Sequence, residues 1–191
     1  MKSNAMRIAV LGGMTVFFCS GTVFSQTCAG GGMSAKGGGS AHDKMFLMKS
    51  SEGGMAEVEM GKIAAEKGSS EDVKSFGQKM VDDHTKLLND MKPIAEGMGV
   101  KPVTHLNAAH QAEAKKLKSL SGESFDKTYI KMMVEDHHKD LKEFKAEESS
   151  TKNADLKTAV SQGEQVIQQH TDMIDGIAKK NGIATPGASS M

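Results

Sequence analysis

Three histidines, each preceded by two apolar and two polar residues, are the residues of this sequence best suited to chemistry. The pentapeptides read MVDDH, MVEDH and VIQQH, and they end in His84, His137 and His170. A neutral imidazole is a good ligand for Zn, Fe, Cu or Ni. Three such groups at the same place in three repeated segments would form a metal site if the fold brings them together.

Each of these histidines interrupts an apolar stripe with helical spacing. Steps of four and three through residues 73–98 meet only one polar residue, His84, and the same steps through residues 156–177 meet only His170. Residues 130–144 give a similar stripe around His137. Such a stripe is the buried face of an amphipathic helix. Two of the stripes also carry a glycine one heptad before the histidine, which predicts space or a close backbone approach there.

A fourth helical segment, residues 43–67, has no histidine in its body but carries Glu57 and Glu59 near its middle. Periodicity does not choose between the two carboxylates. We therefore predict that His84, His137 and His170 converge with Glu57 or Glu59 around one divalent metal ion. Because the imidazoles must be neutral, affinity should fall as the pH drops through roughly 6.5, the ordinary histidine pKa.

The alternative is a buried polar layer whose histidines only make hydrogen bonds within the core. Asp83 and Asp136 each precede a histidine and so point about 100° away from it on a helix. That direction favours salt bridges with lysines at the polar rim over metal binding. The remaining histidines, His42, His105, His110 and His138, fall outside the predicted site.

The segments that would position these side chains read as helices. Long patterns cover about residues 43–67, 70–98, 123–149 and 154–181, and a short one covers 106–120. Serine, asparagine and glycine stand at the expected ends. Residues near the middle of neighbouring helices lie at the same level of a bundle, whichever direction the helices run, so the three histidines can share one layer. The stretch 99–123 can cross the whole bundle, which predicts an all-α, ferritin-like four-helix bundle with a long crossover containing a short extra helix.

Composition narrows the functional classes. The 191 residues include no Trp, one Tyr and 15 Met, so the core must be aliphatic, as suits helix packing. Formal net charge is zero, and Arg7 is the only arginine, which argues against nucleic-acid binding. No phosphate loop or serine or cysteine nucleophile set is present. The sequence therefore does not favour an enzyme.

The beginning of the chain has the pattern of an export signal. Residues 1–25 combine the charges of Lys2 and Arg7 with an uncharged, mostly apolar run that ends before a cleavage pattern at Ser25. The run is too short for a membrane span, so no transmembrane anchor is expected in the mature chain. We expect a Gly/Ser-rich flexible tether at 26–42, holding the single mature cysteine Cys28, then the bundle at 43–182 and a disordered tail at 183–191.

Several runs resemble a family of exported bacterial proteins that are labelled as a domain of unknown function or as putative outer-membrane proteins. The matching runs are Gly53–Lys62, Asp72–His84, Ser121–Gly122, Phe125–Tyr129, Asp136–His137 and His170. The resemblance implies a ferritin-like bundle and a periplasmic location, compatible with association with the outer membrane. Ferritin-like di-iron proteins place a Glu three residues before the metal-binding His. Here Val81, Val134 and Ile167 stand at those positions, which favours a single metal over a di-iron centre.

The leading hypothesis from the sequence is thus a secreted, periplasmic bundle that binds a metal ion or small ligand at a central His/Glu layer, with a role in envelope stress. The alternative is a structural or partner-binding bundle with a buried histidine layer. Either is compatible with a homo-oligomer, and the sequence does not identify a protein partner.

Overall fold

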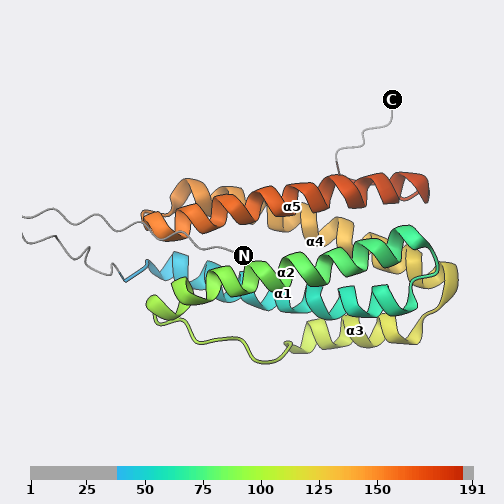
Figure 1. Cartoon of the computed structure of the whole chain (residues 1–191), viewed down its shortest axis with the longest axis horizontal. Helices are drawn as coiled ribbons and strands as arrows, with labels where there is room; N and C mark the ends of the chain where they lie inside the picture. Colours follow the sequence, from blue (N-terminus) through green and yellow to red (C-terminus); the bar gives the residue numbers. More distant parts are fainter. Residues whose placement is uncertain (1–37, 187–191) are drawn as a thin grey trace, which may run out of the picture. The chain divides into compact units, whose positions relative to one another are not determined.

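The computed structural model describes residues 38–186 and contains five helices in that range (Figure 1). They are α1 (Ala41–Lys67), α2 (Glu71–Gly97), α3 (Ala108–Ser119), α4 (Gly122–Ser150) and α5 (Ala154–Lys180). The described part of the chain contains no β-strand. The predicted export signal at 1–25, Cys28, most of the tether and the end of the tail lie outside the described residues.

The four long helices form two hairpins joined by a crossover (Figure 1). Helix α1 packs mainly on α2, α4 mainly on α5, and the α2–α5 and α1–α4 contacts join the pairs. The connection from α2 to α4 runs the length of the bundle and includes α3, which packs on α1 and α4. The predicted all-α bundle with a long crossover and a short extra helix is therefore confirmed.

Side-chain caps fix where the helices begin. Ser40 Oγ accepts a hydrogen bond from Asp43 N at 3.0 Å, while Asp43 Oδ2 accepts one from Ser40 N at 2.9 Å, a reciprocal capping box. Because of this cap, α1 begins at Ala41, two residues before the predicted start of the bundle at residue 43. Asn153 caps α5 through Leu156 N at 2.9 Å. At the other end of α5, Ile183 packs against the core, within the predicted tail.

Two seam glycines have different packing roles. A Cβ atom on Gly77 would lie 2.7 Å from Ala65 N and 2.8 Å from Gly61 O, so this glycine lets the backbones of α1 and α2 approach closely. A Cβ atom on Gly163 would lie 2.6 Å from Cε1 of Phe144, so this glycine makes room for an aromatic ring from α4. The predicted close backbone approach thus occurs at Gly77.

The apolar core consists of two clusters with a polar layer between them. Along α2, Met80 belongs to one cluster and Met91 to the other, with His84 between them. The same order holds along α5, where His170 lies between Ile167 of one cluster and Ile174 of the other. The histidines therefore occupy the middle of the bundle, as expected from their positions in the helices.

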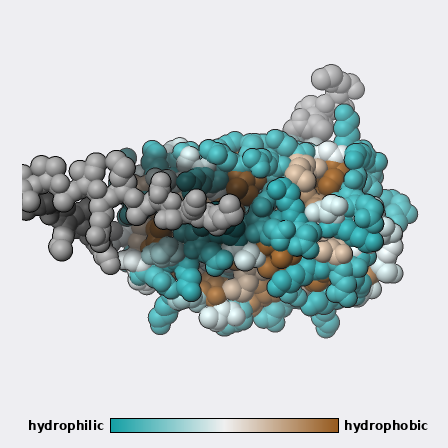
Figure 2. All heavy atoms as spheres, viewed as in Figure 1, coloured by the Kyte–Doolittle hydropathy of each residue, from teal (hydrophilic) through white to brown (hydrophobic). Residues whose placement is uncertain are grey.

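The outer face in Figure 2 is mostly hydrophilic, with hydrophobic residues scattered among the charged ones. Within residues 38–186, no helix combines the length and the apolar character needed to span a membrane.

Candidate metal centre

Three helices bring one imidazole each to the same buried layer. His84 from α2 is 3% exposed, and His137 from α4 and His170 from α5 are 0% exposed. The ring centroids are 5.8 Å apart for His84 and His137, 5.2 Å for His84 and His170, and 5.5 Å for His137 and His170. One ring nitrogen from each lies within 4.8 Å of the others. The three histidine side chains therefore converge in the structure, as expected from the sequence.

Each ring is held by a partner at one of its nitrogens. His137 Nδ1 lies 2.9 Å from the Met133 carbonyl oxygen, one turn earlier in α4. His170 Nε2 lies 2.8 Å from Asp83 Oδ2, which reaches across from α2. His84 Nδ1 lies 3.0 Å from Glu57 Oε2 of α1. Partners of this kind orient the histidine ligands of metal sites.

The opposite nitrogens have no hydrogen-bond partner. A carbonyl oxygen can only accept, so Nδ1 of His137 carries the hydrogen and its Nε2 presents a lone pair. The ionised Asp83 fixes His170 in the same way, with the lone pair on Nδ1. The buried atoms without a partner in the described part of the chain include His84 Nε2, His137 Nε2 and His170 Nδ1. Unpaired buried nitrogens are costly, and a metal ion would satisfy all three.

The structure separates the two candidate glutamates. Glu57 is 3% exposed, and its Oε1, which has no hydrogen-bond partner, lies 3.6 Å from His137 Nε2. Glu59 points elsewhere and pairs with Lys118 of α3 at 2.8 Å. Glu57 is thus the glutamate of the histidine layer, where one oxygen supports His84 and the other is free to reach a cation. Glu59 is not part of that layer.

Burial keeps the imidazoles neutral. It lowers the pKa of His84 well below the ordinary value, and the two neighbouring histidines lower it further. It lowers the pKa of His137 to about 3. The pKa of His170 is also lowered by burial, although the hydrogen bond to Asp83 opposes the shift. Protonation near pH 6.5, expected from the sequence, is therefore moved to more acid pH, because a charged ring would lose its hydration in this layer.

The carboxyl groups beside the layer shift the opposite way. Burial raises the pKa of Glu57 well above its usual range, and the nearby charges of Asp140 and Asp136 raise it further. Burial also raises the pKa of Asp136 to about 6 and that of Asp140 to about 7. A cation in the layer would favour the ionised form of all three. Metal binding would therefore release protons from carboxyl groups more than from imidazoles.

Aromatic rings close one side of the layer. The Phe76 ring meets His137 at 5.9 Å and His170 at 6.2 Å between centroids, both edge-on. Tyr129 packs against Phe76, and its buried hydroxyl has no hydrogen-bond partner. Burial, with the charge of Glu57, raises the pKa of Tyr129, so its phenol stays protonated. These rings exclude water, which strengthens electrostatic interactions inside the site.

Sequence reasoning missed the role of Asp83. It was expected to pair with a lysine, and it does accept from Lys79 Nζ at 2.7 Å, but it also holds His170. His138, placed outside the site, pairs with Asp175 of α5 at 3.0 Å. The positions three residues before the site histidines, Val81, Val134 and Ile167, supply no carboxylate. The residues present therefore fit one metal ion better than a bridged pair.

The fold and site define an all-α bundle with a buried polar layer of histidines and a glutamate. The family model described as a domain of unknown function, DUF4142, matches residues 29–177, and the chain belongs to this family. A search of curated proteins gave no match. Among solved structures, the chain is similar to a DUF305 fragment from Deinococcus radiodurans, with a TM-score of 0.65 and 11% identity over 74% of this chain and 98% of that one. This likeness supports the helical fold alone.

Proposed function

We propose that the protein binds one divalent transition-metal ion in the middle of the bundle through His84, His137 and His170. The observation that carries the proposal is the set of three buried ring nitrogens without a hydrogen-bond partner. The rings of His137 and His170 are fixed by a hydrogen bond at the opposite nitrogen, and the opposite nitrogen of His84 lies 3.0 Å from a Glu57 oxygen. A layer that served only as hydrogen-bonded core polarity would pair the lone pairs of these nitrogens with nearby hydrogen-bond donors.

The supporting residues have distinct roles in this proposal. Glu57 orients His84 and offers a free carboxylate oxygen beside His137. Asp83 fixes the tautomer of His170. Three imidazoles with a carboxylate suit Zn, Fe, Cu or Ni. Ligand nitrogens would approach to about 3.3–3.5 Å of one another when each binds a shared ion at about 2.0–2.1 Å.

In this proposal residues 1–25 are the export signal and the protein works in the periplasm. There the bundle would take part in the response to envelope stress by holding a metal ion. The proposal favours binding over catalysis, because Val81, Val134 and Ile167 stand where a carboxylate would be needed to bridge a second metal ion. The proposal is compatible with an association with the outer membrane through a partner.

Metal content after native purification, followed by titration of chelator-treated protein with Zn, Fe, Cu and Ni, tests this function. We expect about one ion per chain at the central layer. His137→Gln removes one ligand nitrogen and should weaken binding by at least tenfold, whereas His105→Gln, on an exposed loop, should leave it unchanged. If none of the four metals binds, the buried-polar-layer interpretation replaces the proposal.

A further inference from the structure

A second cluster of ligating side chains lies at the end of the bundle, where α1 begins and α4 ends (Figure 1). His42, Asp43 and Glu147 each offer one ligand atom, and these atoms lie within 4.8 Å of one another. Asp43 and Glu57 are separated by 14 positions in the same helix, about 21 Å at the rise of an α-helix. The cluster is therefore separate from the central histidines.

Glu147 is the residue that distinguishes this cluster from an ordinary surface group of acids. Its side chain is 0% exposed, and neither carboxylate oxygen has a hydrogen-bond partner. His42 Nδ1 comes within 2.8 Å of Oε2, but this close approach does not supply a hydrogen bond to the oxygen. A buried carboxyl group without a donor either lowers stability when it is ionised or stays protonated, and a bound cation would favour its ionised form.

The neighbouring carboxylate is already oriented. The capping box described above fixes Asp43 through Oδ2, and Asp43 is 5% exposed. Hydrogen bonds from Ser40 hold the pKa of Asp43 below its usual range against the effect of burial. Burial raises the pKa of Glu147, with Asp43 adding to the shift. Without a cation, one of the two acids is thus ionised and the other favours its protonated form.

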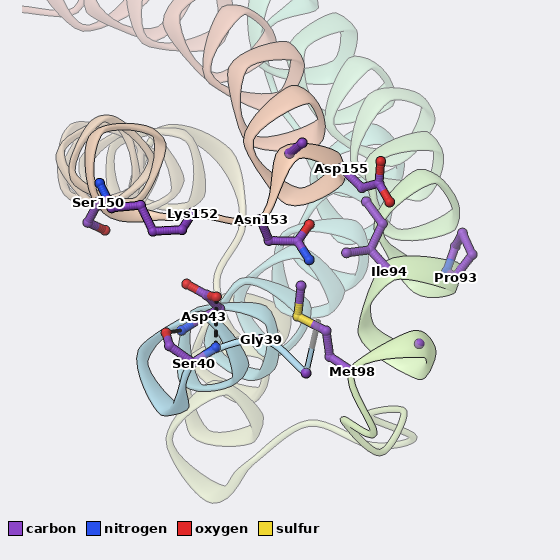
Figure 3. A pocket seen from close by; sticks show the side chains of 13 residues that line it. Gly39, Ser40, Asp43, Pro93, Ile94, Met98, Ser150, Lys152, Asn153 and Asp155 are labelled. Atoms are coloured by element: carbon purple, nitrogen blue, oxygen red, sulfur yellow. Dashed lines mark hydrogen bonds between the residues drawn. The ribbon is translucent and has the colours of Figure 1, made fainter. Parts of the chain in front are cut away.

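The cluster is open to solvent on one side. The His42 side chain is 67% exposed, and Asp43 lines an open cavity of about 750 Å³. Figure 3 shows the Asp43 carboxylate at this cavity, beside Ser40, and Lys152 lines the same cavity. Glu147 also lies in the last turn of α4, and the C-terminal end of a helix attracts positive charge. Solvent therefore reaches His42 and Asp43, the two side chains beside the buried Glu147 carboxylate.

We propose that His42, Asp43 and Glu147 form a second site, which binds a divalent cation of the Zn²⁺ or Mn²⁺ class at the end of the bundle. One imidazole and two carboxylates are a mixed nitrogen and oxygen set, which these borderline cations accept. Solvent reaches the cluster on one side, which leaves room there for water molecules as further ligands of the cation. The site exchanges its cation more readily than the enclosed central layer.

Zn²⁺ titration of the full chain by calorimetry, combined with Zn²⁺ counting after equilibrium dialysis, tests the second site. We expect two ions per chain, one of which is weaker. Glu147→Gln and His42→Ala should each weaken that ion by at least tenfold and leave the central ion bound. Glu148→Gln changes the charge equally on the adjacent residue of α4 and should have no effect.

The His137→Gln variant separates this site from the central one. It should lose the central ion and keep the ion at the end of the bundle, and adding His42→Ala should remove that ion as well. His42 is exposed, so its substitution tests the site even if Glu147→Gln fails to fold. The proposal is overturned if His42→Ala and folded Glu147→Gln bind Zn²⁺ as the wild type does, or if His137→Gln leaves no Zn²⁺ bound.

Discussion

His170 Nε2 lies 2.8 Å from Asp83 Oδ2, and this contact joins α5 to α2 across 87 positions of the sequence. Asp83 sits at the edge of the core, 30% exposed, while the ring it holds is 0% exposed. The carboxylate therefore fixes a buried imidazole from the rim of the bundle. It also sets which nitrogen of His170 faces the other two histidines.

Asp83→Asn should weaken metal binding without unfolding the protein. The amide has no charge and can present a donor to Nε2, which would allow the wrong tautomer of His170. Loss of such a supporting partner typically lowers metal affinity by about 10- to 100-fold. Competition titration with a chelating dye measures the change. Asp82→Asn is the matched control because Asp82 is exposed and accepts only from Gln78 Nε2; an equal effect of both variants would contradict the assigned role.

Glu57→Gln should change how metal affinity depends on pH. The raised pKa of Glu57 means that its proton must leave before its charge can support a cation, so wild-type affinity should increase as the pH rises toward that pKa. Glutamine cannot ionise, so the variant should bind at least tenfold more weakly at high pH and lose most of this dependence. Titrations from pH 5.5 to pH 8.5 would measure it.

Glu59→Gln serves as the control for that experiment. Glu59 lies two residues from Glu57 but pairs with Lys118, away from the histidine layer. Its substitution should leave both the affinity and its pH profile unchanged. A wild-type profile in Glu57→Gln would show that Glu57 takes no part in binding.

The helices could be predicted from the sequence because apolar spacing and capping residues agree along most of the chain. The three histidines could also be placed in one layer, since each interrupts an apolar stripe near the middle of its helix. The choice of Glu57 over Glu59 could not be made this way. Glu57 shares its face with Gly54 and Gly61, and glycine carries no apolar side chain that would mark the face as buried.

Contacts between segments far apart in the chain could not be predicted from the sequence either. The Asp83–His170 contact depends on how α2 and α5 pack, and the spacing of residues within either helix does not indicate it. His42 was assigned to a tether because Gly/Ser-rich residues precede it. The Ser40 cap instead starts α1 early enough to bring His42 beside Glu147, more than one hundred positions away.

The metal-free protein should lose stability on acidification through the histidine layer. The folded-state pKa of His137 is about 3, whereas the unfolded ring titrates near 6.5. Between these values the unfolded state binds more protons, so the free energy of unfolding falls as the pH drops. The loss for this residue is on the order of a few kcal/mol. Glu57 acts in the opposite direction, since its raised pKa favours the folded state as the pH drops.

Comparison with His137→Leu isolates the contribution of the ring, because Glu57 is common to both proteins. Urea unfolding of metal-free protein at pH 7.5, 6.0 and 5.0 should show a smaller loss of stability on acidification in the variant than in the wild type. Parallel losses in the two proteins would mean that His137 does not titrate with the shift assigned to it.

Gly77→Ala should destabilise the bundle, because a Cβ atom there would lie 2.7 Å from Ala65 N and 2.8 Å from Gly61 O. Both are backbone atoms, so α1 and α2 would have to move apart, at a cost of roughly 1–3 kcal/mol for overpacking. Gly176 in α5 is the matched control, since a Cβ atom there meets nothing within 4 Å. Gly176→Ala should stabilise the protein by about 0.5–1 kcal/mol through helix propensity. Thermal and urea unfolding of both variants should therefore shift in opposite directions, and a stabilising Gly77→Ala would contradict the close approach of α1 and α2.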